Sequence, residues 1–160
     1  MREPFYHIDT FKPRISVGYL LRHTSKLCGA RIETMFDDAD VSFTQWIALA
    51  LIHGEIADTC SRLARDIGHN TGAMTRVLDQ LVERGLVRRE RDELDRRVSK
   101  LILTSDGEAT VRRLAVKVVD YWNDLLADFE RHEIETVIDV LTRLSARMEQ
   151  METPAEVRLS

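Results

Sequence analysis

The 160-residue sequence contains few of the residues that mark several large classes of protein. It has two cysteines, three prolines and seven glycines. Two scattered cysteines, Cys28 and Cys60, exclude a disulfide framework and a cysteine-based zinc site, and we expect both to be small buried hydrophobic residues. So little proline and glycine argues against a β-rich or disordered chain.

Long hydrophobic runs and common catalytic motifs are absent as well. No apolar run approaches the roughly 18 residues that span a bilayer, and residues 1–14 lack the apolar stretch of a secretory signal. We therefore expect a cytoplasmic protein with no membrane partner. The histidines have no ligand spacing such as His-x-x-x-His, and no glycine-rich phosphate loop or nucleophile elbow occurs. The sequence thus predicts no enzyme activity, no metal site and no cofactor.

Charge is unevenly distributed along the chain, whose net charge is −4. Between Cys60 and Lys100, ten Arg and Lys residues outnumber seven Asp and Glu residues. The rest of the chain has thirteen basic and twenty acidic residues. A basic centre inside an acidic frame concentrates the attraction for a polyanion on one part of the molecule.

The spacing of apolar residues predicts a mainly helical protein. The expected helices cover residues 13–36, 44–53, 61–67 and 71–84, followed by a long helix with apolar residues from 111 to 129 and a final one with apolar residues from 134 to 151. Pro13 suits the first turn of the first helix. Ser42 or Thr44 can cap the second, Asn70 or Thr71 the fourth, and Thr104 the fifth. Glycines follow the three shorter helices and are expected to end them.

A β-hairpin is expected between the fourth and fifth helices. Residues 86–90 and 98–103 read as two short strands, and a highly charged loop joins them. Two short helices joined by a turn at Gly68 and followed by a hairpin are typical of a winged helix-turn-helix. The predicted fold is therefore mainly α with a small β-hairpin wing.

The fourth helix has side chains suited to reading DNA. A helix fits the major groove of B-DNA, where small and polar side chains reach base edges. Gly72 and Ala73 allow a close approach near the helix N-terminus, whose amides can face a phosphate, and Arg76 can contact guanine or a phosphate. The candidate contacts on this helix are Asn70, Thr71, Gly72, Ala73, Thr75 and Arg76. A solvent-exposed helix face without any DNA contact is the alternative interpretation.

The hairpin loop supplies further candidate contacts. Arg91, Arg96 and Arg97 would project from the hairpin, where a narrow minor groove or its flanking phosphates can receive an arginine. Asp95 could hold one of these guanidinium groups in a fixed orientation before DNA arrives. We therefore interpret the charged loop as the tip of a wing and the apolar strand after it as its anchor.

The stretch from Ser61 to Gly107 resembles the DNA-binding core of the MarR family of bacterial transcriptional regulators. The wing signature of that family, Asp-x-Arg followed after five residues by Leu-Thr, is matched by Asp95, Arg97, Leu103 and Thr104. The motif LVERGLV at residues 81–87 and the segment SFTQWIALALI at residues 42–52 are also similar to it. The first helix, with GYLLRHTSKL, looks more like the MarR/SlyA branch. The resemblance extends over nearly the whole chain.

The resemblance implies a sequence-specific DNA-binding transcriptional regulator, and we expect a repressor. It also implies a homodimer joined through helices at 13–36 and 105–151, with a DNA-binding region at 42–104; the remaining residues, 152–160, are expected to form a flexible tail. The long terminal helices independently favour a partner, because a domain this small cannot cover their apolar stripes alone. A twofold dimer would place two recognition helices about 34–36 Å apart on a pseudo-palindromic operator.

Members of this family commonly respond to small aromatic or anionic compounds or to cysteine oxidation. A cationic, aromatic-walled cleft lined by Arg22, His23, Lys26 and Trp46 would suit such an effector. His23 as an ordinary surface or packed residue and Trp46 as a core residue are the alternative. Cys28 lies too deep in the first helix to match the family's reactive cysteine, so redox sensing is not expected.

A rival hypothesis keeps the fold and changes the function. A winged-helix protein can serve as a protein-interaction or architectural module without binding a specific operator. Such a protein would be expected to lack the arginines of the recognition helix and the wing, which this sequence retains. Affinity for duplex DNA that falls steeply with salt distinguishes the two, because phosphate contacts release counterions.

Overall fold

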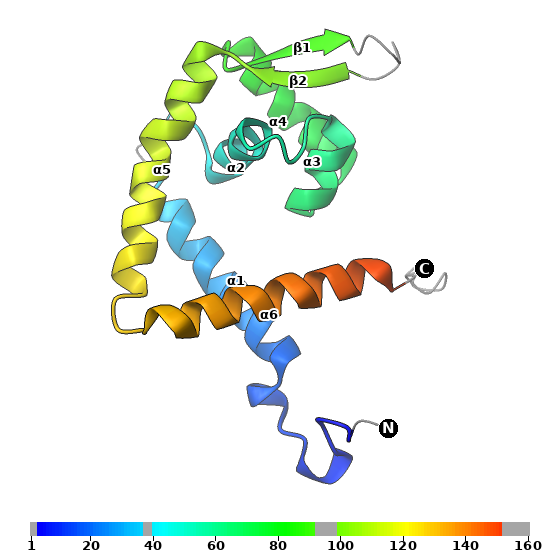
Figure 1. Ribbon diagram of the computed structural model, residues 1–160. Coiled ribbons are helices and arrows are strands. Elements are labelled where there is room, and N and C mark those ends of the chain that lie inside the picture. Colours follow the sequence, from blue (N-terminus) through cyan, green and yellow to red (C-terminus); the bar gives the residue numbers. More distant parts are fainter. Residues whose placement is uncertain (1–2, 37–39, 92–98, 152–160) are drawn as a thin grey trace. The chain divides into compact units, whose positions relative to one another are not determined.

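The computed structural model describes residues 3–36, 40–91 and 99–151 (Figure 1). The chain divides into two compact units, residues 1–118 and residues 119–160. The helices are α1 (Val17–Thr34), α2 (Phe43–His53), α3 (Cys60–Ile67), α4 (Thr71–Glu83), α5 (Ser105–Leu125) and α6 (Arg131–Gln150). The strands are β1 (Val87–Arg91) and β2 (Ser99–Leu103), and two short 3-10 turns, Ile8–Thr10 and Pro13–Ile15, precede α1. The mainly α fold with a β-hairpin is confirmed.

The first helix is shorter than predicted. The prediction that it begins at Pro13 was wrong, because Pro13 lies in a separate 3-10 turn. The Ser16 hydroxyl accepts a hydrogen bond from the Tyr19 amide at 3.3 Å, and the extended backbone of Ser16 sets the start of α1 at Val17. A serine cap therefore decides where this helix begins.

Side-chain caps also move the starts of α2 and α3 one residue ahead of the predicted positions. Ser42, rather than Thr44, caps α2: its hydroxyl accepts from the Gln45 amide at 3.2 Å, and the Gln45 side chain accepts from the Ser42 amide at 2.9 Å. This reciprocal pair is a capping box. Thr59 caps α3 by accepting from the Arg62 amide at 3.4 Å.

The core of the first unit lies where α2, α3 and α4 meet the start of α5. Its fully buried large side chains are Val41, Leu49, Leu63, Met74, Leu78, Leu81, Val87 and Leu114. Three of these, Met74, Leu78 and Leu81, recur at helical spacing and form the buried stripe of α4, beside half-buried Val77. The stripe on α4 thus fixes which face of the helix stays outside.

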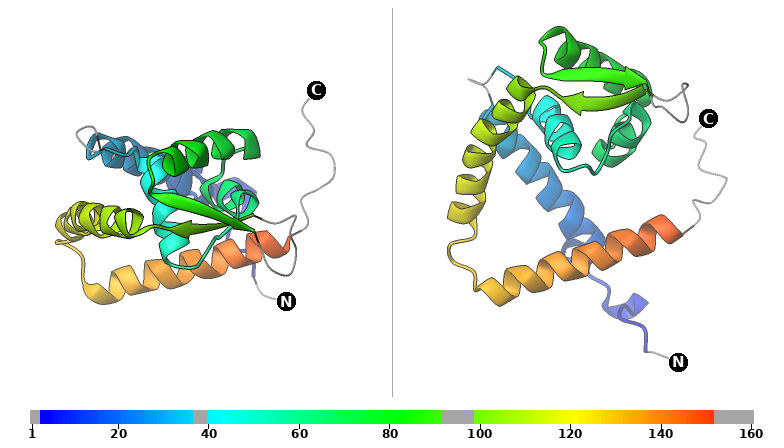
Figure 2. Two further views of the ribbon diagram at one scale, coloured as in Figure 1. Left: turned by 90° about the horizontal axis from the view of Figure 1, so that it is seen from above. Right: turned by 45° about the horizontal axis from the view of Figure 1, so that its top comes forward.

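The hairpin is antiparallel and lies against the α2–α4 bundle (Figure 2). Val87 pairs with Leu103 at its base and Arg91 pairs with Ser99 at the other end. The Leu101 amide donates to the Asp58 carbonyl at 2.8 Å, so β2 is also held by the loop between α2 and α3. β1 begins and ends one residue later than predicted.

The junction of the hairpin and α5 is closely packed around Gly107. A Cβ atom on this residue would lie 2.1 Å from the Leu86 carbonyl oxygen, which no side chain tolerates. Thr104 caps α5 as predicted, because its hydroxyl accepts from the Gly107 amide at 3.1 Å and donates to the Gly85 carbonyl at 2.6 Å. The base of the wing is therefore held against the start of α5 by the hydrogen bonds of Thr104 and by the close approach of Gly107 to Leu86.

The second unit contains the end of α5 and all of α6. The prediction that the stripe of α5 continues to Phe129 was wrong, since α5 ends at Leu125. A capping box between Glu130 and Glu133 starts α6. None of the residues of α6 is buried, and its exposed apolar side chains are Val137, Ile138, Val140, Leu141 and Met148.

Three further predictions concern burial, the tail and the membrane. Cys28 and Cys60 are half-buried rather than buried: α1 buries only Ile32, and Cys60 opens α3 at its exposed edge. The predicted tail, residues 152–160, lies outside the described residues. Over the ranges that the structure describes, none of the helices has the length and apolar character needed to cross a membrane.

Candidate DNA-binding interface

The helix-turn-helix consists of α3, a turn at Gly68 and α4. Gly68 has a φ of 76°, in the left-handed region that favours glycine, so the chain can reverse within two residues. Asn70, not Thr71, caps α4: its side-chain oxygen accepts from the Ala73 amide at 2.8 Å. The first turn of α4 is therefore well defined, and Asn70 already has a structural role besides any contact with DNA.

The exposed face of α4 carries most of the predicted contacts. Thr71, Gly72, Thr75 and Arg76 are exposed and Ala73 is half-buried. At Gly72, an added Cβ would meet only the Asn70 side-chain oxygen at 3.5 Å, an ordinary contact. Packing within the protein therefore does not require a glycine there, which leaves an approaching partner as a reason for its small size.

Thr75 and Arg76 differ in how much of their bonding capacity is free. The Thr75 hydroxyl donates to the Thr71 carbonyl at 2.8 Å and lies 3.5 Å from the Cys60 sulfur. Its one proton is thereby engaged, so toward a base edge it can accept a hydrogen bond or offer its methyl group. Arg76 makes no hydrogen bond or ion pair with the other residues that the structure describes. Its guanidinium group remains available for a base or a phosphate.

The wing candidates are only partly covered by the structure. Arg91 is exposed at the end of β1. Asp95, Arg96 and Arg97 lie outside the described residues. The hairpin that would present them is in place, with its charged strand β1 beside α4.

Sequence reasoning missed the charged residues within β1 itself. Arg88 pairs with Glu90 on one face of the strand, and on the other face Arg89 donates to Asp79 of α4 at 2.7 Å. Alternation along the strand indicates that Arg89 shares a face with buried Val87, but it does not indicate that this face meets Asp79 of α4.

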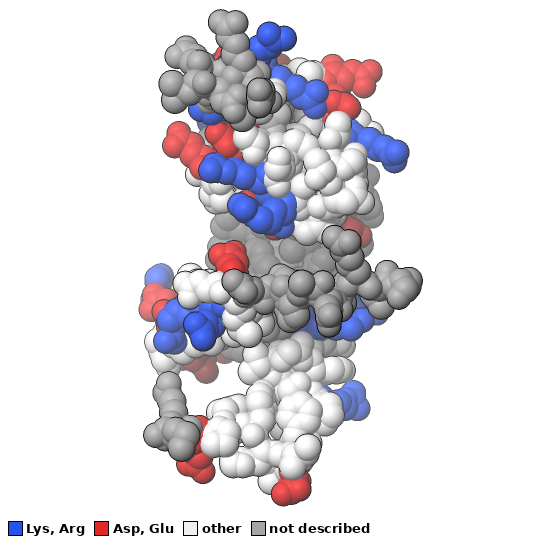
Figure 3. Space-filling model, turned by 90° about the vertical axis from the view of Figure 1, so that its right-hand side faces the viewer, with Lys and Arg blue, Asp and Glu red and all other residues white. Residues whose placement is uncertain are grey.

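Basic side chains gather around this unit. In Figure 3, several Lys and Arg side chains lie in the upper part of the view, where Figure 1 places the hairpin and α3, among Asp, Glu and uncharged residues. At α3, two acids pair with neighbouring arginines: Asp58 with Arg62 and Asp66 with Arg65, both at 3.3 Å. Paired acids reduce the repulsion that a phosphate backbone would meet.

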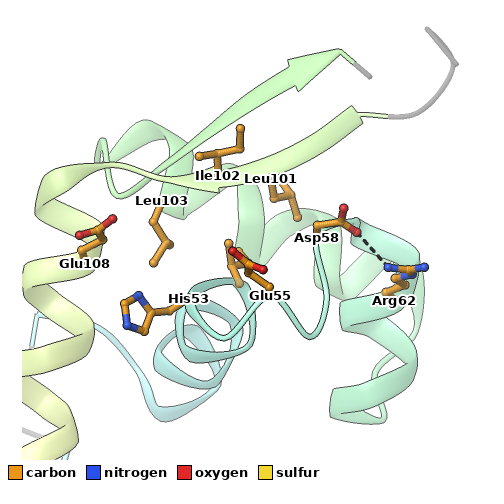
Figure 4. Close-up of a pocket in the computed structure, with 9 residues that line it drawn as sticks. His53, Glu55, Asp58, Arg62, Leu101, Ile102, Leu103 and Glu108 are labelled. Carbon is orange, nitrogen blue, oxygen red and sulfur yellow. Dashed lines mark hydrogen bonds and ion pairs between the residues drawn. The ribbon is translucent and has the colours of Figure 1, made fainter. Parts of the chain in front are cut away.

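A pocket of about 460 Å³ lies beneath the wing (Figure 4). It is lined by Ile52, His53, Glu55, Asp58, Arg62, Leu101, Ile102, Leu103 and Glu108. Leu101 and Leu103 enter it from β2. Two carboxylates, Glu55 and Asp58, approach it from the loop between α2 and α3, and Glu108 approaches it from α5 (Figure 4). This mixture of apolar walls and acids is poorly suited to an anionic ligand, because three carboxylates face one arginine.

The predicted effector residues are not gathered around a described pocket. Arg22, His23 and Lys26 are exposed, and His23 stacks on Tyr19 with ring centroids 5.6 Å apart. Trp46 instead belongs to an aromatic cluster with Phe36 and Phe43 and donates from Nε1 to the Val111 carbonyl at 3.5 Å. None of these four residues lines the pocket beneath the wing or the one beside Phe43.

Comparison with known proteins finds similar sequences and structures. The model of the MarR family matches residues 41–99 of this chain. Its structure is similar to wild-type MarR from E. coli in the apo form (TM-score 0.69, 24% identity, 81% of this chain and 97% of that one). It is also similar to MepR from S. aureus in complex with DNA (TM-score 0.69, 18% identity, 86% and 99%) and to BpsR from Bordetella bronchiseptica (TM-score 0.71, 20% identity, 84% and 96%). These likenesses show a winged helix fold.

Proposed function

We propose that this chain, whose residues 41–99 match the model of the MarR family, is a DNA-binding regulator of transcription and not an enzyme. The observation that carries the proposal is the exposed face of α4, where Gly72, Thr75 and Arg76 follow a capped N-terminus beside a basic strand. Such a helix can enter the major groove while the wing contacts the backbone. MepR, which shares the fold, has been crystallised with DNA. A protein with this role would act in the cytoplasm, next to the chromosome.

Specific contacts are proposed for two groups of residues. Asn70, Thr71, Gly72, Ala73, Thr75 and Arg76 would lie in the major groove. Arg91, Asp95, Arg96 and Arg97 would form the wing contact. Base edges specify sequence and phosphates fix position, so the first group should set preference and the second should contribute affinity for any duplex.

The protein would act as a homodimer on a pseudo-palindromic operator, as a repressor. The homodimer is supported by the apolar surface left exposed on the terminal helices: Leu20 and Leu27 on α1, and Ile138 and Leu141 on α6. Exposed apolar stripes of this kind are typical of a partner surface. Two recognition helices related by a twofold axis would read half-sites about 34–36 Å apart.

Release from DNA by a small aromatic acid is a further part of the proposal. BpsR supports it by analogy, since 6-hydroxynicotinic acid regulates its DNA binding. On this chain Arg22, His23 and Lys26 are the exposed cationic or aromatic side chains that would attract a carboxylate, with Trp46 as the aromatic wall. The acid-lined pocket beneath the wing is the poorer place for such a ligand.

The experiment that tests the proposal is a selection of duplexes from fragmented genomic DNA with purified protein near physiological salt. Enrichment of a pseudo-palindrome with half-sites one helical turn apart is expected, with affinity that falls steeply as salt rises. The Arg76→Ala substitution should then weaken binding to the selected duplex by about 1–3 kcal/mol and relax its sequence preference. Arg112→Ala, on α5, removes the same charge away from α4 and is the matched control.

Two results would contradict the proposal in different ways. Salt-sensitive binding without any enriched sequence would favour an architectural role. No binding to duplex DNA at all would favour a protein-interaction module, the alternative function of this fold. An Arg76→Ala protein that binds like the Arg112→Ala protein would remove α4 from the interface while leaving DNA binding itself in place.

A further inference from the structure

An acidic residue lies on the face of α4 that is proposed to meet DNA. Asp79 follows Thr75 by four residues and Arg76 by three, so it lies one helical turn further along the same exposed face. Its side chain is 55% exposed. A carboxylate there would repel the phosphate backbone and weaken DNA binding unless a positively charged side chain offsets its charge.

The partner of Asp79 belongs to another element. Arg89 of β1 donates from Nη2 to the Asp79 carboxylate at 2.7 Å, and the arginine side chain is 41% exposed. The distance is that of a strong, charge-assisted hydrogen bond. This ion pair joins α4 to the hairpin. It neutralises the acid and connects the two elements that would read DNA.

The position of Arg89 on the strand makes the connection useful. Val87, Arg89 and Arg91 lie on the same face of β1, because side chains alternate between the two faces of a strand. Each residue advances the strand by about 3.3 Å. Arg91, a proposed wing contact, therefore lies only about 7 Å beyond the ion pair. At the base, backbone contacts already hold the hairpin through Leu101 and Thr104. The ion pair extends that hold along β1 toward the tip.

We propose that Asp79 is a positioning residue: by holding Arg89, it fixes the wing at one angle to α4, so that both meet DNA in a single geometry. The inference rests on the proposed function. For a substitution that removes the Asp79 charge, it predicts a change in DNA affinity opposite to that expected from charge repulsion alone. Removing an acid next to a polyanion should tighten binding, whereas loss of the ion pair should weaken binding to the correct sequence and reduce discrimination against others.

The test is a double-mutant cycle on the full-length protein. Wild type, Asp79→Asn, Arg89→Gln and the double variant are titrated with a duplex selected by the wild-type protein and with a scrambled duplex of equal length. Exposed ion pairs shift equilibria by at most about fivefold, so we expect Asp79→Asn to weaken binding to the selected duplex about three- to fivefold and to leave the scrambled duplex unchanged or bound more tightly. The cycle isolates the pair from the separate loss of a positive charge at Arg89.

Glu83→Gln is the matched control, because Glu83 lies one turn further along the same helix and makes no ion pair with another described residue. It removes an equal charge from α4 and should tighten binding to both duplexes slightly. Asp79→Glu keeps the carboxylate and should retain most of the discrimination. Amide exchange in β1 is measured on the same proteins and on Arg89→Gln without DNA. It should accelerate at Glu90, which forms a hydrogen-bonded pair with Lys100, in Asp79→Asn and Arg89→Gln but not in Glu83→Gln or Asp79→Glu.

Two outcomes overturn the inference. If Asp79→Asn tightens binding to the selected duplex as Glu83→Gln does, the acid has no positioning role. If the effects of Asp79→Asn and Arg89→Gln on the selected duplex are additive, the pair does not act as a unit. A wild-type protein that binds neither duplex would instead remove the proposed function, and the exchange rates in β1 would then show separately whether the pair holds the strand.

Discussion

Two helices with the same kind of apolar pattern have opposite surroundings in this chain. On α4, Met74, Leu78 and Leu81 recur at helical spacing and are completely buried in the first unit. On α6, residues at the same spacing remain exposed, with Ile138 at 59%. A periodic apolar stripe therefore predicts that a helix will be covered, but not whether its own chain or a second molecule covers it.

The largest expected effect on the free energy of unfolding comes from a substitution in the buried stripe of α4. Leu78→Ala removes methyl groups from a side chain with no exposed surface. Core substitutions of this kind cost about 2–5 kcal/mol, because the cavity that remains closes only in part. Urea unfolding followed by circular dichroism should show a midpoint well below that of the wild type.

Ile138→Ala is the matched control on the exposed side. At protein concentrations low enough to favour monomers it should lower the unfolding free energy by less than about 0.5 kcal/mol, as surface substitutions do. A loss as large as that of Leu78→Ala at every concentration would mean that Ile138 is buried within its own chain, and the contrast between the two helices would disappear.

A second substitution at Ile138 tests whether the exposed stripe of α6 forms a dimer interface. Ile138→Glu places a charge in the proposed dimer surface, where burial without a partner is costly. We expect the dimer to dissociate at least tenfold more readily while each subunit keeps its helical content. Sedimentation equilibrium measures the change in mass, and Glu149→Gln, near the end of the same helix, serves as a charge-altered control. An unchanged dimer would exclude this face of α6 from the interface.

The same contrast explains how far the sequence could be read. Rules about nearest neighbours along the chain predicted the order of the elements, the Gly68 turn and the Thr104 cap, and they missed helix starts by one residue where a better cap, Ser42 or Thr59, was available. These rules did not predict contacts between segments that are distant in the sequence. The pairing of Asp79 with Arg89 depends on how β1 lies beside α4, which no local pattern encodes.

Two glycines show the same difference between local patterns and contacts with distant segments. Gly107 is required by the Leu86 carbonyl oxygen, a contact between segments far apart in sequence that motif spacing alone does not explain. Gly72 has no comparable neighbour, so nothing in the fold accounts for it. The candidate DNA contacts on α4 could be proposed from sequence because an exposed helix face follows directly from its buried one. The wing residues 95–97 remain predictions, because they lie outside the described residues.

The smallest expected effect uses Gly72 to separate folding from recognition. Gly72→Ala should stabilise the protein by up to about 1 kcal/mol, because alanine loses less backbone entropy in a helix and its Cβ meets only an ordinary contact. Gly18→Ala is closely matched: Gly18 is also the second residue of its helix, α1, and has open space around it. Both variants should melt at or slightly above the wild-type temperature. Only Gly72→Ala adds a methyl group to the face proposed to enter the groove, so it alone should weaken binding to the selected duplex, by a fewfold. Equal DNA affinity in the two variants would show that Gly72 does not approach DNA, and α4 would then have to read its site from Thr75 and Arg76 onward.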